Sequence, residues 1–358
     1  MRKVVAQSKR FACVSLGEHR ESTVVTINEV AKAAGVSIST VSYALSGKRS
    51  ISRATRERID RAIRELGYTP NAGARMLAGA RTNILALSAP LHADGHLPTH
   101  MRFVTEVVRA ARERDYDVLL LARDDEVTGI RRVASTSLVD GVVAMGVTER
   151  DERVALVRSL GVAAAFIGVP GDSDGVACVD LDFAEAARMA VERLVADGHR
   201  TIGVIGHPHG YVDRQQTFMA RFEDGLAAAA AEAGVRIVHE WAEVSRGAGA
   251  RAADALLDAV EPPTAIIFHC NEPAVEEAER RIRERGLAVP RDLSLFAAAA
   301  SYDPGRLETP VTGITLPMEE MCTSAVEAAL GLRGGTALAT TRILAPELVD
   351  RGSTVAVA

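Results

Sequence analysis

Residues 26–81 decide the fold of the first part of the chain and read TINEVAKAAGVSISTVSYALSGKRSISRATRERIDRAIRELGYTPNAGARMLAGAR. Apolar residues recur here at helical spacing, directly after residues that favour helix starts, so the stretch predicts short helices. Thr26 and Glu29 have the spacing of a capping box before the first helix. Gly35 can end that helix because glycine readily adopts a positive φ.

Two further helices follow in the same stretch. Ser37 is expected to cap the second helix, in which Val41 and Leu45 can both face inward at i, i+4 spacing. Ser52 is expected to cap the third helix, and Gly67 to end it. The buried stripe of the third helix is predicted to be Ile59, Ala62, Ile63 and Leu66. Short helices joined by a tight turn containing glycine are the helix-turn-helix pattern.

This stretch resembles the DNA-binding headpiece of the lactose-repressor/purine-repressor (LacI/GalR) family. The resemblance is carried, in order, by TINEVAKAAGVSISTVSYAL, TRERIDRAIRELGYTPN and ARMLAGAR. It implies a sequence-specific transcriptional regulator, most often a repressor, that binds a near-palindromic operator in double-stranded DNA. It also implies a homodimer or tetramer, and a small-molecule effector that controls DNA binding.

The charge distribution agrees with DNA contact by the headpiece alone. Residues 24–81 contain ten Lys and Arg against four Asp and Glu, whereas residues 82–358 contain 27 basic and 41 acidic side chains. The net charge of −5 for the whole chain conceals this difference. A basic head on an acidic body favours phosphate contacts by the head.

The resemblance places the second helix in the major groove. There Ile38 can contact a thymine methyl group, and Ser39 can hydrogen-bond to several bases. Ser37, Thr40 and Ser42 can instead contact phosphate. Alternatively, Thr40 only fills the gap between helices. The expected DNA contacts in the headpiece are Thr26, Ser37, Ile38, Ser39, Thr40, Ser42 and Tyr43.

A short hinge helix is expected just after Pro70. In isolation so short a helix is marginal, and the resemblance implies that it folds when paired with its dimer mate on DNA. Leu77 would then insert into the minor groove as an apolar wedge; alternatively, Met76 and Leu77 cover the surface of the body. The expected DNA contacts in this segment are Asn71, Arg75, Leu77 and Ala78.

The remaining chain alternates short apolar runs with helical patterns, which predicts two doubly wound parallel sheets and therefore two lobes. The predicted strands are 83–90, 117–122, 139–145, 163–169, 201–206, 235–240, 264–269 and 293–299. The predicted helices are 101–114, 130–137, 152–160, 183–196, 215–233, 248–259, 273–285 and 318–332. The motifs GHRTIGVIG, PTAIIFHCNEPAV, GLAVPRDLSL and TPVTGITLPMEEM extend the resemblance to a periplasmic-binding-protein-like core.

The resemblance also gives the expected domain organisation. It implies that 24–69 are the headpiece, 70–82 the hinge helix and linker, and 83–358 the effector-binding and dimerisation core. Residues 1–23, whose positive charge is not followed by a long apolar run, are expected from their own sequence to be a disordered extension or to result from an upstream start codon. Three lobe crossings are expected near 179–181, 309–313 and 338–345. They give a first lobe of about 83–179 and 313–338, and a second of about 180–310 and 342–358. Helices 101–114 and 318–332 would form the dimer surface.

The effector is expected between the lobes, at the strand ends near Pro90, Gly146, Gly168, Gly206 and His269. The candidate effector-binding residues are Asn271, Glu272, Arg221, Phe222, His207 and Leu316. Glu272 stands where the family has an aspartate that binds ligand, and Phe222 stands where it has an arginine. Because Leu316 and the alanines of FAAAAS also replace polar residues, a simple sugar effector is doubtful and the ligand should be less hydroxylated than a hexose.

Other site types have weaker support. The segment LHADGHLPTHM at residues 91–101 contains His92, Asp94, His96 and His100, which suit a metal, anion or pH-sensitive site, or only a solvated loop. We expect no metal and no cofactor. The cysteines are far apart, which favours the reducing cytoplasm; they are Cys13, Cys178, Cys270 and Cys322. No apolar run reaches about 18 residues, so no membrane span is expected.

Two other classes of protein compete with a transcriptional regulator. A solute-binding receptor of a transport system shares the two-lobed body, but the helix-turn-helix pattern and the lack of a signal-peptide pattern count against it. A nucleotide-using enzyme would need a phosphate-binding loop. The glycines Gly203, Gly206 and Gly210 do not match G-x-G-x-x-G, and no nucleophile or carboxylate pair stands out. No catalytic activity is expected.

Overall fold

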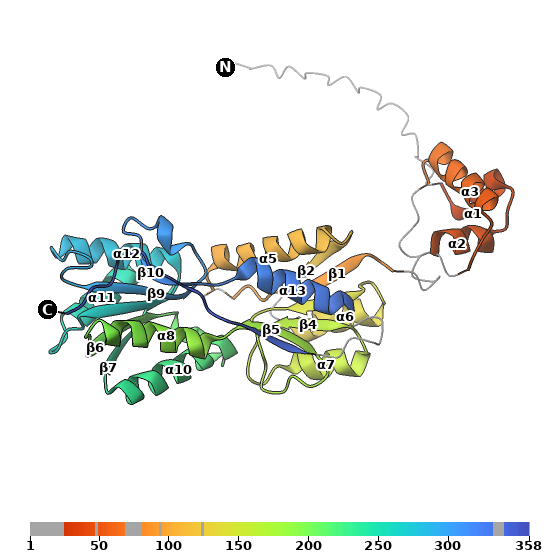
Figure 1. Cartoon of the computed structure of the whole chain (residues 1–358). Helices are drawn as coiled ribbons and strands as arrows, with labels where there is room; N and C mark the ends of the chain where they lie inside the picture. Colours follow the sequence, from red (N-terminus) through yellow and green to blue (C-terminus); the bar gives the residue numbers. More distant parts are fainter. Residues whose placement is uncertain are drawn as a thin grey trace, which may run out of the picture. The chain divides into compact units, whose positions relative to one another are not determined.

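The computed structural model describes residues 25–46, 49–68, 81–92, 95–122, 125–331 and 340–357. The chain divides between residues 81 and 82 into two compact units, which we call the headpiece and the core (Figure 1). Within the described ranges, no helix is both long enough and apolar enough to cross a membrane.

Three helices form the described part of the headpiece: α1 (Ile27–Ala34), α2 (Ile38–Ser46) and α3 (Arg53–Leu66). The backbone N–H of Thr26 donates to the Glu29 carboxylate at 2.7 Å, which satisfies a donor that the helix cannot. Gly35 ends α1 with a φ of 63° and Gly67 ends α3 with a φ of 61°. The predicted helix ends at these two glycines are therefore confirmed.

One apolar cluster joins the three helices. It consists of Val30, Ala31, Ala34, Val41, Ile59, Ala62 and Tyr68. Two predicted core residues lie at the surface instead, because Leu45 is 38% exposed and Leu66 is 36% exposed. On α2 the inward position belongs to the partly buried Ala44. At the end of α3, Tyr68 donates its backbone N–H to the Ile63 carbonyl at 3.0 Å and is buried in the place expected for Leu66.

The first lobe of the core contains a six-stranded sheet in the order β11-β5-β4-β3-β1-β2. All neighbouring strands in it are parallel. The strands are β1 (Ile84–Ser88), β2 (Asp117–Leu121), β3 (Gly141–Ala144), β4 (Ala164–Ile167), β5 (Ala177–Leu181) and β11 (Thr341–Leu344). The inner strands are buried runs of small and branched apolar residues, as expected when helices cover both faces of a parallel sheet.

The second lobe repeats this architecture with the order β12-β10-β9-β8-β6-β7. Only β12 is antiparallel to its neighbour, β10. The strands are β6 (Thr201–Gly206), β7 (Arg236–Trp241), β8 (Ala265–His269), β9 (Ser294–Ala300), β10 (Thr312–Thr315) and β12 (Leu348–Val349).

Helices cover both faces of each sheet (Figure 1). In the first lobe α5 (Leu97–Arg112) and α13 (Met318–Gly331) pack on one face, and α6 (Glu126–Ser135) and α7 (Glu152–Leu160) on the other. In the second lobe α8 (Phe183–Ala196) and α10 (Thr217–Ala233) pack on one face, and α11 (Ala248–Leu257) and α12 (Glu272–Glu284) on the other. Two short helices, α9 (His209–Asp213) and the 3-10 helix η1 (Pro304–Arg306), complete the second lobe.

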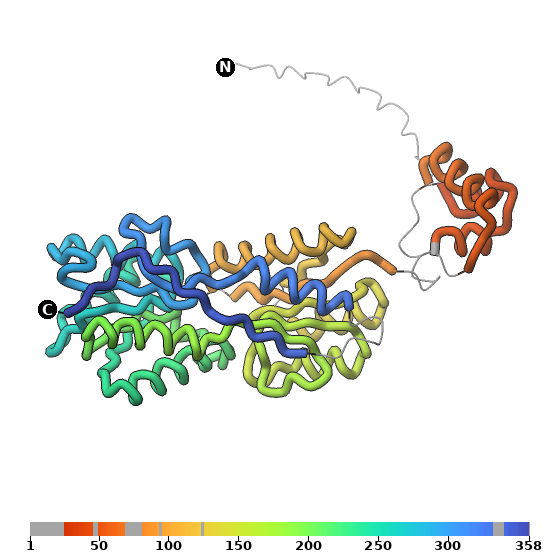
Figure 2. Tube along the Cα trace, in the orientation of Figure 1, coloured from red at the N-terminus to blue at the C-terminus, as the bar shows by residue number. Residues whose placement is uncertain are grey.

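The chain crosses between the lobes three times, as expected, but at shifted positions (Figure 2). The crossings lie between β5 and α8, between β10 and α13, and between β11 and β12. Residues 179–181, expected to be a crossing, belong to β5, and residues 342–344, expected in the second lobe, belong to β11 in the first sheet. The sequence pattern missed β5 because Asp180 interrupts its apolar run, although Asp180 is only 2% exposed.

Candidate functional site

The first two turns of α2 carry the side chains for which base contacts were predicted. Ile38 is 50% exposed and Tyr43 is 37% exposed. The Ser37 hydroxyl accepts the Thr40 N–H at 3.2 Å and lies 2.9 Å from the Ser39 hydroxyl, so it caps the helix. Ile38 and Tyr43 are therefore large side chains of this helix that remain open to a partner.

Two other features of the headpiece bear on DNA contact. The guanidinium of Arg49 lies 5.9 Å from the centre of the Tyr43 ring, which places a cation beside the exposed helix. The Thr26 hydroxyl donates to Glu29 at 2.9 Å, so this predicted contact residue is engaged in the cap. The predicted hinge contacts Asn71, Arg75, Leu77 and Ala78 lie outside the described residues.

The core contains a cavity of about 110 Å³ between its two lobes. It lies at the carboxyl ends of the strands, where the strand order reverses between β1 and β3 and between β6 and β8. The lining residues that follow these and the neighbouring strands are Pro90, His92, Met145, Gly146, Gly168, His207, His269, Asn271 and Ser301. Four of the five predicted strand-end positions line the cavity: Pro90, Gly146, Gly168 and His269. At the fifth, His207 lines the cavity and its neighbour Gly206 does not.

An ion pair joins the lobes beside this cavity. Arg221 on α10 donates to the Asp180 carboxylate at 3.1 Å and to the Val169 carbonyl at 3.3 Å. Asp180 lines the cavity, and its other carboxylate oxygen accepts the Leu181 N–H at 3.1 Å. Burial raises the pKa of Asp180 to about 7, although Arg221 opposes this shift. The carboxylate thus depends on a partner supplied by the other lobe.

Rings from the second lobe form one wall of the cavity. The Phe222 ring is stacked on His269, with centroids 3.7 Å apart. The rings of His207 and Phe218 meet His269 edge-on at 5.0 Å and 6.0 Å. Burial lowers the pKa of His207 to about 3 and holds the pKa of His269 well below its usual value. Both imidazoles are therefore neutral near pH 7.

The other predicted effector residues lie at different depths. Asn271 and Leu316 line the cavity together with His207, whereas Phe222 lies behind His269. Glu272 does not line the cavity: it begins α12, and its carboxylate lies 3.4 Å from the Arg102 guanidinium. The Glu272 carboxylate thus has Arg102 as a partner, and its contact with an effector stays a prediction.

The histidine-rich segment is partly helical, because α5 begins at Leu97, earlier than predicted. His92 and His100 line the cavity, while the His96 ring bonds to the Thr99 hydroxyl at 2.9 Å. Within the described residues, which exclude Asp94, no group of three or more His, Cys, Asp or Glu side chains is placed to hold a metal ion.

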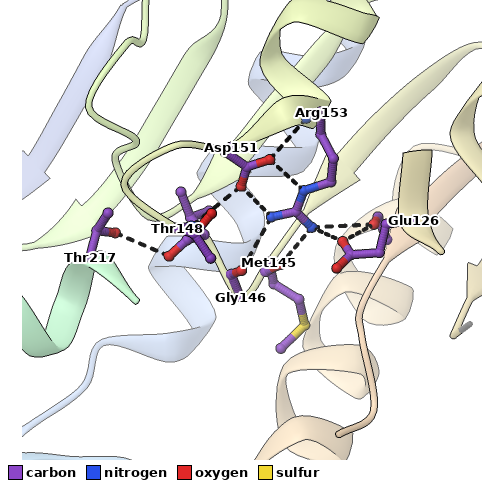
Figure 3. A network of polar contacts seen from close by, with 9 residues as sticks. Glu126, Met145, Gly146, Thr148, Asp151, Arg153 and Thr217 are labelled. Carbon is purple, nitrogen blue, oxygen red and sulfur yellow. Dashed lines mark hydrogen bonds and ion pairs between the residues drawn. The ribbon is translucent and has the colours of Figure 1, made fainter. Parts of the chain in front are cut away.

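A buried network in the first lobe holds the cavity wall in place (Figure 3). The Arg153 side chain is 4% exposed and donates to Asp151 at 2.6 Å and to Glu126. It also donates to the carbonyls of Met145 at 2.9 Å and Gly146 at 3.2 Å, and both of these residues border the cavity. Burial raises the pKa of Glu126, and Arg153 opposes that shift. The network therefore fixes the end of β3.

The loop after β3 continues from this network to the second lobe. The Thr148 N–H donates to Asp151 at 3.4 Å, and Thr148 forms a β-bridge with Gln216. The Thr217 N–H donates to the Val147 carbonyl at 3.1 Å. This backbone contact spans the lobes close to the cavity, so a change in lobe separation would alter it directly.

Arg153, Asp180 and Gln216 are site residues that were not predicted from the sequence. A signal existed for Arg153, because it falls on the buried face of the predicted helix 152–160 beside Val154 and Val157. A charged residue on such a face needs a buried partner. For Asp180 and Gln216 no local signal existed, because their partners come from the opposite lobe.

Comparisons with known proteins agree with this geometry. The profile described as bacterial regulatory proteins, lacI family, matches residues 26–71, and that of the periplasmic binding protein-like domain matches residues 191–354. The HTH-type transcriptional regulator DegA of Bacillus subtilis (strain 168) is 32% identical over 342 residues, covering 92% of this chain and 98% of DegA. The chain belongs to the LacI family.

Other LacI-family proteins give the same result. The HTH-type transcriptional regulator AglR of Rhizobium meliloti (strain 1021) is 31% identical, covering 76% of this chain and 77% of AglR. A lac repressor dimer bound to operator and the anti-inducer ONPF shares the fold, with a TM-score of 0.78 and 24% identity, covering 93% and 99% of the two chains. A CelR–cellobiose complex has a TM-score of 0.64 and 26% identity, covering 92% and 99%.

The LacI-family membership gives the function in outline. The protein is a transcriptional regulator with a DNA-binding helix-turn-helix headpiece and an effector-binding core of two mostly parallel sheets. The curated relatives named above are likewise transcriptional regulators.

Proposed function

We propose that the protein is a cytoplasmic repressor that binds a near-palindromic operator as a homodimer, and that a small molecule in the interlobe cavity sets its operator affinity. The observation that carries this proposal is the cavity itself, which both lobes line beside the Asp180–Arg221 ion pair. A ligand there contacts both lobes and so favours one lobe arrangement. If that arrangement has a different operator affinity, ligand and DNA influence each other reciprocally.

The DNA-binding role is assigned to residues 24–69, with the hinge at 70–82. In this proposal Ile38, Ser39 and Tyr43 read bases, while Ser37, Thr40 and Ser42 contact phosphate or support the helix. The hinge contacts are Asn71, Arg75, Leu77 and Ala78, with Leu77 as the minor-groove wedge. The protein is proposed to have no catalytic activity and no membrane partner.

The proposed dimer surface is the outer face of α5 and α13, which pack on each other in the first lobe. Met101 on α5 is 41% exposed and Val108 is 42% exposed, which leaves apolar side chains on this face uncovered in the single chain. Their burial between two copies would remove apolar area from water.

Binding-site selection from genomic fragments, followed by footprinting, tests the DNA-binding proposal. The expected result is a protected site with dyad symmetry. A core fragment of residues 83–358 should not bind DNA. Leu77→Ala should reduce specific affinity and DNA bending while non-specific binding at low salt persists. A footprint without dyad symmetry, or DNA retention by the core fragment, would contradict the proposal.

A further inference from the structure

We propose that the cavity binds an uncharged single-ring aromatic or heteroaromatic compound with one or two polar substituents. This inference rests on the proposed function, because it names the class of effector for the same cavity. It follows from four properties of the cavity: its size, its ring-lined wall, the nitrogens of two buried histidines that have no partner among the described residues, and the absence of Lys and Arg from its described lining.

The size of the cavity suits a ligand of about one ring. Its volume is about 110 Å³. Drug-sized ligands occupy pockets of roughly 300–1,000 Å³, whereas an apolar cavity of about 150 Å³ binds benzene. A disaccharide such as the cellobiose of the CelR complex is larger than this cavity can hold with the lobes in the present arrangement.

The wall of the cavity is suited to a flat ring. Phe183, Phe218 and His207 surround His269 with ring centroids between 5.0 and 6.3 Å from it, mostly tilted or edge-on. Tyr211 adds a further edge against Phe218 at 5.9 Å. Aromatic rings prefer offset or edge-to-face neighbours at such distances. An incoming ring would extend this cluster.

Two buried histidines contribute unpaired nitrogens to the wall, beside the side-chain amides of Gln216 and Asn271. Within the described residues, neither ring nitrogen of His269 has a hydrogen-bond partner, and neither does Nδ1 of His207. His269 is 1% exposed, so bulk water does not readily satisfy these atoms. A neutral imidazole offers one donor and one acceptor. A hydroxyl, amide or ring nitrogen on the ligand is the matching group.

Several other polar groups of the wall already have partners. The Thr99 hydroxyl lies 3.2 Å from that of Ser301, and the Thr217 hydroxyl donates to the Val147 carbonyl at 3.4 Å. A hexose needs partners for most of its hydroxyls, and these protein hydroxyls would have to break their own hydrogen bonds. The polar groups that remain for a ligand are amides and imidazoles, such as those of Gln216, Asn271 and His269, which match one or two polar substituents on a ring.

The lining also disfavours a charged ligand. Among the described lining residues there is no Lys or Arg, and the carboxylate of Asp180 is paired with Arg221. Arg214 lies nearby, but its guanidinium is over the Tyr211 ring, 5.2 Å from the centroid. His207 and His269 are neutral, and burial lowers the pKa of His100, which also lines the cavity. A ligand carboxylate or phosphate would lose its hydration without gaining a counter-ion.

The test uses the full-length protein and matched probes, measured by thermal shift, calorimetry and operator affinity. Two matched pairs are compared: phenol with cyclohexanol, which differ in aromaticity, and benzamide with benzoate, which differ in charge. Uracil represents an uncharged heteroaromatic ring and glucose a hexose. A broader panel of uncharged phenols, pyridines and pyrimidines is screened beside them. Probes are used at roughly 5 mM, because ligands of so few atoms bind weakly. The variants are His269→Phe and His207→Phe, with His209→Phe as control, because the exposed His209 does not line the cavity.

The expected result is that uncharged aromatic probes raise Tm and change operator affinity, while cyclohexanol, benzoate and glucose bind at least about tenfold more weakly. His269→Phe or His207→Phe should weaken the polar aromatic probes by about tenfold, and His209→Phe should not. Tighter binding of glucose or benzoate, or no response to any uncharged ring compound, overturns the inference. Operator selection separates the two proposals, since a wild-type protein that selects no operator either with or without the probes would contradict the proposed function instead.

Discussion

Asp180, at the end of β5, and Arg221, on α10, join the two lobes through an ion pair of 3.1 Å. The carboxylate is 2% exposed, while the side chain of Arg221 is 32% exposed. The pair therefore combines a dehydrated carboxylate with a guanidinium that remains partly hydrated. This asymmetry makes the lobe contact sensitive to the protonation of Asp180.

The first prediction concerns pH. Because the pKa of Asp180 is raised to about 7, the folded protein binds this proton more tightly than the unfolded chain does. Protonated Asp180 therefore contributes to the free energy of unfolding fully below about pH 4, and this contribution is lost as the pH rises to about 7. The Tm of Asp180→Asn minus that of wild type should therefore increase from about pH 5 to about pH 8. Asp224→Asn, at an exposed position on α10, is the control. A difference that is constant with pH would contradict the prediction.

The second prediction concerns the buried network of α7. Arg153→Met should lower the free energy of unfolding by about 3–5 kcal/mol, because Asp151 and Glu126 would remain buried without their cation. Arg158→Met is the matched control on the same helix. Arg158 pairs with the exposed Asp172 at 2.7 Å, so its removal should change stability little. Denaturant unfolding measures both, and equal effects would remove the special role of Arg153.

The third prediction concerns α2, the helix that is proposed to contact the bases. Ile38→Ala should weaken specific operator binding by on the order of tenfold, because the helix loses an exposed apolar contact to the bases. Headpiece stability should be unchanged. Leu66→Ala removes another exposed apolar side chain, on α3, and should leave operator affinity as in wild type. Competition with non-specific DNA distinguishes lost specificity from lost affinity; an unchanged specificity ratio for Ile38→Ala would exclude base reading.

The fourth prediction concerns salt. Residues 24–81 carry a net charge of +6, so operator affinity should fall roughly tenfold or more for each few-fold rise in salt concentration. Filter binding over a salt series gives the slope. Arg49→Ala should reduce the slope if Arg49 contacts phosphate beside Tyr43, whereas Arg246→Ala in the core should not.

Local features of this protein were predicted well from the sequence. The helix ends at Gly35 and Gly67 follow from backbone conformations that glycine adopts readily. Strand 201–206 and helices 152–160 and 183–196 have the predicted bounds, because Asp151 and Asp182 cap the two helices and the strand is a short, almost fully buried run. The general position of the cavity followed from the parallel strand order.

Partnerships between distant residues were not predictable. Nothing in the sequence indicates that Glu272 pairs with Arg102, which is 170 positions away in the chain. Asp180 lies in a strand whose neighbours β4 and β11 are formed by segments before and far after it. No local pattern indicates which of the many charged side chains will meet across the lobes, because that depends on how the two sheets pack.

The three lobe crossings have a consequence for synthesis of the chain. The first sheet lacks its edge strand β11 until residues 341–344 have been made, and the second lacks β12 until residues 348–349 have been made. The helix α13, which covers one face of the first sheet, also comes after nearly all of the second lobe. Neither lobe can therefore reach its native state as the ribosome releases it, and both must finish folding together once the last crossing has emerged.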